Sequence, residues 1–131
     1  MNYIFDASSV FKAIKEAAPE AVAGRYTLEL ARYELGNILW KEYGARGKAT
    51  DEELKRLARL VKDVLNLMEA VTIGCHEEQI LDLARQLRLT FYDASYVYYA
   101  RDLGLPLVTE DSDLIDKARS QVKALKLDSI L

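Results

Sequence analysis

The segment Tyr3-Ile4-Phe5-Asp6-Ala7-Ser8-Ser9 joins a short apolar run directly to an acidic turn that can cap a helix. An apolar run without polar alternation is typical of a strand that is buried on both faces, as in a parallel sheet. The stretch Leu107-Val108-Thr109 repeats this pattern and leads into Glu110-Asp111. These two stretches predict parallel strands whose carboxyl ends both carry acidic residues.

Strand-like and helix-like patterns alternate along the rest of the chain. Further strands are expected at residues 26–28, 71–73 and 122–125. Helical periodicity follows Ser9 and is also expected over residues 29–43, 51–69, 76–87, 92–103 and 112–119. Because no Asn-Gly hairpin signal separates the strands, the connections should be right-handed crossovers. The sequence therefore predicts an α/β protein, a single domain over residues 1–131 with three α/β/α layers and a central, mostly parallel sheet.

Composition narrows the class of protein. The chain has 131 residues, 50% hydrophobic and 30% charged, which suits a globular domain. No apolar stretch approaches the ~20 residues of a membrane helix, and no signal peptide is expected, since a strand-like run begins at Tyr3. The single cysteine, Cys75, favours a reducing, cytoplasmic location. A net charge of −3 argues against nonspecific coating of nucleic acid, but not against a nuclease with a carboxylate site.

Two acidic residues follow predicted strands, where parallel sheets bind their ligands. These are Asp6 and Asp111. Each has a simpler structural interpretation, because aspartate before a helix is a favoured N-cap worth ~1 kcal/mol. The position of Asp6 or Asp111 alone is therefore compatible with a ligand-binding role and with a purely structural capping role.

Two further acids lie on helix faces that should turn inward. Glu34 flanks an apolar stripe, with Asn37 one turn further along the same side. Its structural alternative is an ion pair with Arg32 or Lys41. Asp93 shares a face with apolar residues near the start of its helix, where it could also act as a cap. We expect Glu34 to be the acid furthest from water and to have a raised pKa, because converging carboxylates repel one another.

A cluster of four carboxylates indicates a site for a hard divalent cation. Mg²⁺ prefers carboxylate, water and phosphate oxygens, and removes the repulsion between the acids. Carboxylate-held metal ions generate hydroxide and stabilise the leaving oxygen in phosphodiester hydrolysis. The cluster therefore predicts metal-assisted cleavage of a phosphodiester.

The motifs resemble those of the PIN-domain nucleases. They are Asp6 with Ser8, Tyr33-Glu34-Leu35-Gly36-Asn37, Tyr92-Asp93-Ala94 and Thr109-Glu110-Asp111. Their order and spacing, over essentially the whole chain, are similar to those of the VapC-type toxins, which are single-domain ribonucleases of prokaryotic toxin–antitoxin pairs. The resemblance implies a metal-dependent endoribonuclease with an RNA substrate, a small DNA-binding antitoxin as partner, and a homodimer.

The resemblance also implies roles for particular residues. The acidic quartet around Mg²⁺ or Mn²⁺ would be Asp6, Glu34, Asp93 and Asp111, with Asp6 and Asp93 as direct ligands. Asp113 would be an auxiliary fifth acid. Ser8, Asn37 and Thr109 would orient the carboxylates or a bound water. A non-catalytic PIN-like interaction module and an RNA-processing nuclease outside a toxin system remain the alternatives.

Other functional classes lack their motifs. A receiver domain needs an acidic pair after its first strand, a haloacid-dehalogenase phosphatase needs Asp-x-Asp there, and dinucleotide and P-loop sites need glycine-rich turns. Cys75-His76 is expected to be structural, with the thiol buried.

Tyr92 or Tyr96 is a candidate substrate contact. Four basic residues at helical spacing are expected to form a solvated helix face: Lys55, Arg56, Arg59 and Lys62. Four others would form basic faces that a homodimer brings together for RNA binding: Lys12, Lys15, Arg85 and Arg88.

Overall fold

The central feature of the computed structural model, which describes residues 2–131, is a five-stranded sheet in the order β3-β2-β1-β4-β5. All four strand pairs are parallel. The strands are β1 (Ile4–Phe5), β2 (Tyr26–Leu28), β3 (Glu69–Val71), β4 (Leu107–Val108) and β5 (Ala124–Leu125). Ile4 pairs with Tyr26 on one side and with Leu107 on the other, so β1 is the middle strand. The predicted parallel sheet is confirmed.

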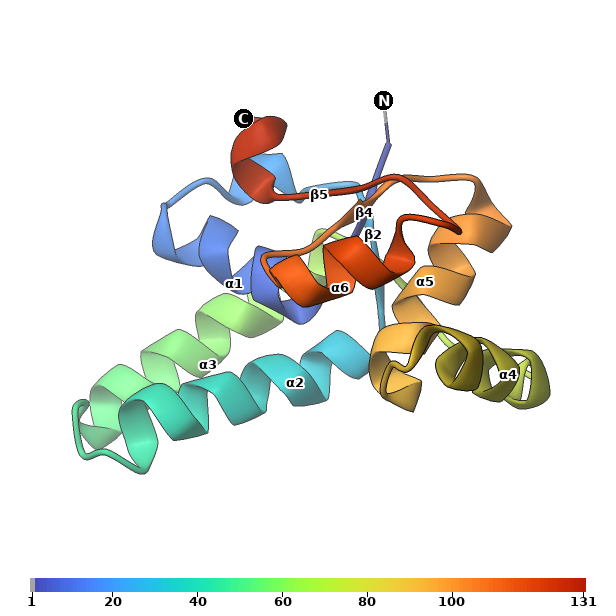
Figure 1. Ribbon diagram of the computed structural model, residues 1–131. Coiled ribbons are helices and arrows are strands. Elements are labelled where there is room, and N and C mark those ends of the chain that lie inside the picture. Colours follow the sequence, from blue (N-terminus) through green and yellow to red (C-terminus); the bar gives the residue numbers. More distant parts are fainter. Residues whose placement is uncertain (1) are drawn as a thin grey trace.

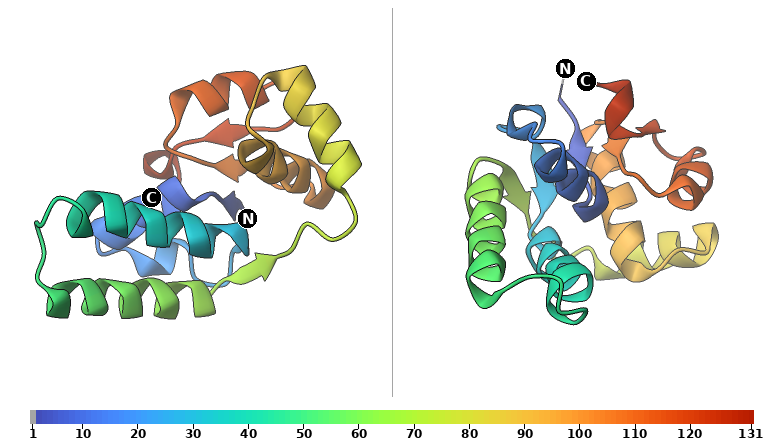
Figure 2. Two further views of the ribbon diagram at one scale, coloured as in Figure 1. Left: turned by 90° about the horizontal axis from the view of Figure 1, so that it is seen from below. Right: turned by 90° about the vertical axis from the view of Figure 1, so that its left-hand side faces the viewer.

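Helices cover both faces of this sheet (Figures 1 and 2). They are α1 (Ala7–Lys15), α2 (Leu30–Leu39), α3 (Asp51–Asn66), α4 (Glu77–Leu87), α5 (Phe91–Leu103) and α6 (Ser112–Ala118). Successive strand residues point to opposite faces. Phe5 and Val108 pack with α1, α2 and α3, whereas Ile4 and Leu107 pack with α4, α5 and α6. Two separate cores therefore lie on either side of the sheet, which confirms the three-layer α/β/α fold.

Local signals explain where several helices begin and end. Thr50 and Glu53 form the reciprocal capping box that the sequence indicates at the start of α3. The α5 helix ends at Gly104, which has φ +66° and accepts the left-handed conformation without strain. The α2 helix continues through a π-helical turn, Trp40–Gly44, so that helical structure reaches residue 44. Three-residue 3₁₀ turns lie at Pro19–Ala21 and Leu127–Ser129.

The third strand was predicted two residues too late. It spans Glu69–Val71 rather than residues 71–73, and α3 ends at Asn66 rather than at residue 69. The reason is that β3 is an edge strand, which pairs only with β2 and leaves Glu69 and Ala70 exposed. An apolar run is the signature of a buried strand and does not identify a strand of this kind.

Two side chains in and near α4 that were predicted to be buried are exposed. The helical pattern of residues 76–87 predicts that Leu81 points inward together with Ile80 and Leu83, but Leu81 is 61% exposed, whereas Ile80 and Leu83 are buried. Cys75 is exposed rather than buried. Its neighbour His76 places Nδ1 3.1 Å from the Ile73 carbonyl oxygen and 3.0 Å from the Tyr99 hydroxyl, so the histidine has the predicted structural role. Within residues 2–131, none of the helices has the length and apolar character needed to cross a membrane.

Candidate active site

Asp6 lies at the carboxyl end of the central strand and is the most enclosed of the four candidate acids. Its side chain is 6% exposed and caps α1 by accepting a hydrogen bond from the Ser9 backbone amide at 3.0 Å. Ser8 Oγ donates to the same carboxylate oxygen at 2.7 Å, and Thr109 Oγ1 donates to the other oxygen at 2.5 Å. Burial raises the pKa of Asp6 although these hydrogen bonds oppose it. The prediction that Glu34 is furthest from water is therefore wrong.

Ser8 and Thr109 join the ends of β1 and β4. Besides donating to Asp6, Ser8 Oγ accepts from the Glu110 amide at 3.0 Å, and Thr109 Oγ1 accepts from the Asp111 amide at 3.2 Å. Each hydroxyl therefore accepts a hydrogen bond from a backbone amide that follows β4 and donates its own proton to the Asp6 carboxylate. Thr109 is fully buried behind Asp6. This network orients the Asp6 carboxylate, and the role of the two hydroxyls in a metal site stays a prediction.

Glu34 reaches the same region from α2. Its Oε1 accepts a hydrogen bond from the Tyr96 hydroxyl at 2.7 Å. Burial, and secondarily the charges of Asp6 and Asp93, raise the pKa of Glu34, while the tyrosine hydrogen bond lowers it. The alternative in which Glu34 pairs with Arg32 or Lys41 does not hold, because Arg32 Nε lies 2.8 Å from Glu29 Oε1 and none of the ion pairs within residues 2–131 involves Glu34 or Lys41.

Asp93 stands in the first turn of α5 but does not cap that helix. Thr90 is the N-cap residue, and its Oγ1 accepts from the Asp93 backbone amide at 3.1 Å. In the part of the chain from residue 2 onward, the Asp93 carboxylate accepts no hydrogen bond from another residue. Burial raises its pKa, as do the charges of Asp6 and Asp111, while Lys117 lowers it. The capping interpretation of Asp93 is therefore wrong.

Asp111 is both a cap and a member of the site. One oxygen of its exposed carboxylate accepts from the Asp113 amide at 3.0 Å and from the Leu114 amide at 3.3 Å, which caps α6. The second oxygen makes neither of these bonds. Asp113 instead pairs with Lys117 at 3.1 Å and does not line the pocket described below, so it contributes charge near the site rather than a pocket-lining carboxylate.

The four acids meet in one pocket of about 260 Å³. The polar residues that line it are Asp6, Ser8, Glu34, Asn37, Asp93, Tyr96 and Asp111. They come from the end of β1, the first turn of α1, α2, α5 and the segment after β4, which are far apart in the sequence. No lysine or arginine lines this pocket in residues 2–131. The predicted quartet is thus brought together with Ser8 and Asn37, while Thr109 supports it from behind.

The donor set of the pocket suits a hard divalent cation. All four acids offer carboxylate oxygens, and the raised pKa values of Asp6, Glu34 and Asp93 show that the site favours neutralisation of negative charge. As the side chains stand in residues 2–131, no three acidic, histidine or cysteine groups are close enough together to hold one ion. The oxygen donors therefore match a hard divalent cation in chemical type, while their present spacing does not form a complete ligand set.

Sequence reasoning missed or misassigned several residues that support the site. Tyr96 was a candidate substrate contact, but it is 1% exposed and holds Glu34. Tyr96 follows Asp93 by one helical turn, and this spacing could have indicated that its side chain lies beside the acidic site. Lys117 is a cation whose charge lowers the pKa of Asp93, and it also donates to the Arg88 carbonyl at 3.0 Å. Lys12 was assigned to a basic surface, but it is engaged with Glu110 at 3.0 Å and Asp128 at 3.2 Å. The basic face of α3 that was predicted to be solvated is exposed at all four residues: Lys55, Arg56, Arg59 and Lys62.

The fold and the acidic pocket can be compared with known families. The PIN-domain model matches residues 1–120, and the chain belongs to the PIN-domain family. It is 33% identical over 129 residues to Exonuclease VapC9 of Pyrobaculum aerophilum, covering 93% of this chain and 90% of that protein. It is 30% identical over 128 residues to Ribonuclease VapC3 of the same organism, covering 89% and 95%.

A solved structure shows the same fold. The crystal structure of PAE2754 from Pyrobaculum aerophilum superposes with a TM-score of 0.81 at 32% sequence identity, over 99% of this chain and 93% of that one. Together with the two relatives, this places the chain among the VapC-type PIN nucleases. The resemblance seen in the sequence motifs is confirmed.

Proposed function

We propose that this protein is a Mg²⁺- or Mn²⁺-dependent endoribonuclease and the toxin of a toxin–antitoxin pair. The observation that carries the proposal is the convergence of four carboxylates, from four separate elements, on one pocket without a lining cation among residues 2–131. Capping accounts for Asp6 and Asp111, but neither capping nor pairing with Arg32 accounts for Glu34 and Asp93. Acids kept together at a cost in repulsion are typical of a functional site.

Some residues of the pocket would bind the cation, and others orient the carboxylates that bind it. Asp6 and Asp93 would hold the cation directly, with Glu34 and Asp111 completing the acidic wall. A divalent ion bound there would supply a hydroxide at neutral pH and stabilise the leaving oxygen of the phosphodiester. Ser8 and Thr109 fix the Asp6 carboxylate, and Tyr96 fixes Glu34.

The supporting groups keep the protonation states that this arrangement needs. Burial and the adjacent Glu34 charge raise the pKa of the Tyr96 hydroxyl, so it remains a hydrogen-bond donor to Glu34. Asn37 presents an amide at the pocket wall, where it can orient a phosphate oxygen or a water molecule.

The partners follow from the same assignment. A VapC-type toxin would act on cytoplasmic RNA and be neutralised by a small DNA-binding antitoxin. We also propose a homodimer, which would place two acidic pockets on one particle. Light scattering of the purified protein at micromolar concentration should give twice the protomer mass, and a fully active monomer would contradict the dimer.

The activity is tested with single-stranded RNA in Mg²⁺, Mn²⁺ or EDTA. The purified protein should cleave RNA with either metal and not in EDTA, and Asp93→Asn should abolish cleavage because the site has few protein ligands. The matched control is Asp116→Asn on α6, since Asp116 is exposed, pairs with Arg119 at 3.4 Å and lies outside the pocket. Cleavage by Asp93→Asn at the wild-type rate would contradict the site assignment.

Linear and circular forms of one RNA separate internal from terminal cleavage. An endonuclease opens the circle, whereas an exonuclease acts only on the linear form. The name of one relative, Exonuclease VapC9, makes this comparison necessary. We expect the circular RNA to be opened, and an intact circle beside a degraded linear RNA would overturn the assignment of internal cleavage.

A further inference from the structure

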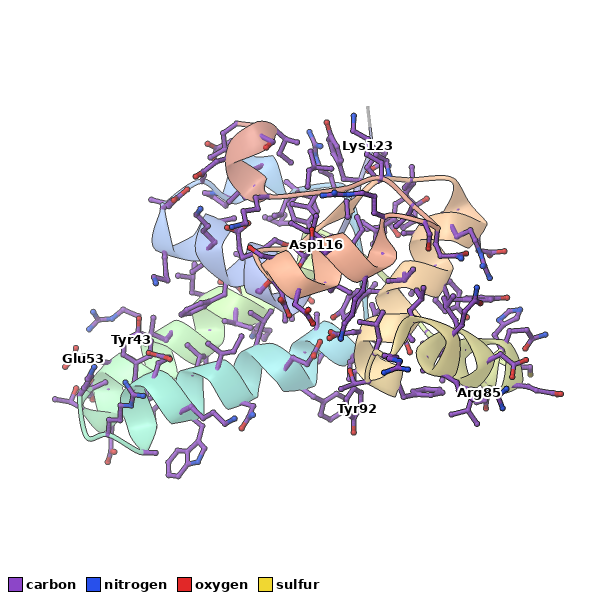
Figure 3. All side chains as sticks on the ribbon, viewed as in Figure 1. Tyr43, Glu53, Arg85, Tyr92, Asp116 and Lys123 are labelled. Atoms are coloured by element: carbon purple, nitrogen blue, oxygen red, sulfur yellow. The ribbon has the colours of Figure 1, made fainter. Side chains whose placement is uncertain are left out.

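An apolar hollow with two exposed tyrosines lies beside the carboxylate pocket. Tyr33 on α2 is 75% exposed and Tyr92 on α5 is 59% exposed, which is unusual for large aromatic side chains. Between them the hollow has a volume of about 260 Å³. Its apolar lining comes from the end of β2, the start of α2, the end of β3 with the segment that follows it, and the start of α5: Leu28, Leu30, Val71, Ile73 and Phe91. Figure 3 shows the Tyr92 side chain projecting outward beside the starts of α5 and α2.

The hollow is continuous with the carboxylate pocket. A shallow groove of about 520 Å³ is lined by Tyr33 and Tyr92, which it shares with the apolar hollow, and by Glu34 and Asn37, which it shares with the acidic pocket. A ligand whose phosphate lies at the carboxylates can therefore extend along this groove and place its next group between the two tyrosines.

We propose that this hollow is a subsite that binds one unpaired nucleobase of the RNA strand, stacked on Tyr33 and Tyr92; the proposal rests on the ribonuclease function proposed above. Unstacked bases of single-stranded RNA bind characteristically against aromatic side chains. The volume is below the roughly 300–1,000 Å³ of ordinary small-ligand pockets, which suits one planar ring system.

The subsite should tolerate more than one base. Two of its polar side chains are engaged, since Ser95 Oγ donates to the Phe91 carbonyl at 2.8 Å and Glu29 pairs with Arg32, and Thr72 adds one further hydroxyl to the lining. Few groups remain to read the edge of a base by hydrogen bonding. Stacking is tolerant of base identity because every base has a π-face.

A protein segment is the competing occupant. A stable protein interface uses about 20–30 residues on each side, whereas this region is one small hollow between two rings. The groove also leads directly to the carboxylates through Glu34 and Asn37, which favours the substrate strand.

The test combines removal of a protein ring with removal of one base. Short single-stranded RNAs, each with one base replaced by an abasic site, are cleaved in Mn²⁺ by wild type, Tyr33→Ala and Tyr92→Ala. At one position the abasic RNA should lower kcat/KM of the wild type by about five- to 150-fold, the range for one stacked base. Tyr33→Ala should cause a similar loss on the intact RNA and no further loss on that abasic RNA. Tyr33→Phe, which keeps the ring, should restore kcat/KM.

Trp40→Ala is the matched control, since Trp40 is an aromatic residue with 59% exposure in the turn that extends α2 but does not line the hollow. It should leave kcat/KM unchanged. Equal losses with Trp40→Ala, or additive losses for Tyr33→Ala and the abasic site, would overturn the subsite. Unchanged cleavage by Tyr33→Ala together with dissociation of a dimer in light scattering would do so too, and would assign the ring to a protein contact.

Anisotropy of a labelled intact RNA in Ca²⁺, another hard cation with oxygen ligands, separates this proposal from the nuclease function. Binding that depends on Tyr33, without cleavage in Mn²⁺, would support the subsite and overturn the nuclease. Cleavage that is indifferent to both tyrosines would support the nuclease and overturn the subsite.

Discussion

Thr109→Val tests whether the hydroxyl network holds Asp6 in its charged form. Thr109 is fully buried, and valine keeps its shape while removing the donor to Asp6 and the acceptor of the Asp111 amide. A hydrogen bond to a charged group contributes ~1.5–3 kcal/mol. The Asp111 amide lies in a partly buried turn, where water can replace the lost acceptor. We therefore expect the free energy of unfolding to fall by about 2–3 kcal/mol, which corresponds to a Tm lower by about 8–12 °C.

Thr27→Val is the matched control. Thr27 is also fully buried, on the neighbouring strand β2, and its hydroxyl donates to the neutral Phe5 carbonyl at 2.8 Å. A hydrogen bond between neutral groups contributes ~0.5–1.5 kcal/mol. The loss for Thr109→Val should therefore exceed the loss for Thr27→Val by about 1 kcal/mol near neutral pH.

The pH dependence separates the two variants more sharply. Burial raises the folded-state pKa of Asp6 above its unfolded value, so wild type loses stability as pH rises through that folded-state pKa. Thr109 opposes the rise, and its removal should raise the pKa of Asp6 further. The deficit of Thr109→Val should thus be small where Asp6 is protonated and grow as pH increases, whereas the deficit of Thr27→Val should stay constant. Urea unfolding in EDTA across this range measures both, and a deficit that is equal for the two variants or shrinks with pH would refute the reasoning.

Two other substitutions should stabilise the protein. Because burial and the charges of Asp6 and Asp93 raise the folded-state pKa of Glu34, its ionisation destabilises the fold as pH rises through that value. Glu34→Gln should therefore increase the Tm in EDTA at neutral pH while abolishing cleavage, and Mn²⁺ should reduce the difference; a lower Tm in EDTA would mean that a cation compensates Glu34. Gly36→Ala should add about 0.5–1 kcal/mol in urea unfolding, because Gly36 is mid-helix with open space at the Cβ position. Gly44→Ala should not share this gain, since its methyl group would meet the Trp40 ring at 2.6 Å.

The sequence predicted those parts of the site that depend on local signals. The apolar runs ending in Asp6 and Thr109 identify strands buried on both faces, and a parallel sheet places their carboxyl ends at one edge. Helix periodicity turned Glu34 and Asp93 inward, the motif resemblance grouped them with Asp6 and Asp111, and all four acids line the pocket. What could not be predicted was their relative burial. Asp6 is deepest because β1 is the middle strand, and helix periodicity around Glu34 contains no information on strand order.

The other errors have the same cause, which is that neighbours in space are not specified by local patterns. Ile80 and Leu81 are 100° apart around α4, and only the residue facing the sheet is buried. Tyr96 looked available for substrate until the fold placed Glu34 beside its hydroxyl. Asp113 shares a motif with Asp111 but turns toward Lys117, its partner one helical turn later.

Calorimetric titration of Mn²⁺ tests most directly whether the four carboxylates form one metal site. Wild type should bind Mn²⁺, and Asp6→Asn, Glu34→Gln, Asp93→Asn and Asp111→Asn should each weaken binding, because each removes one charge from the same pocket. Asp113→Asn is the control and should bind nearly as wild type, since Asp113 pairs with Lys117 outside the pocket. Absence of Mn²⁺ binding by wild type, or undiminished binding by Asp93→Asn, would contradict the account.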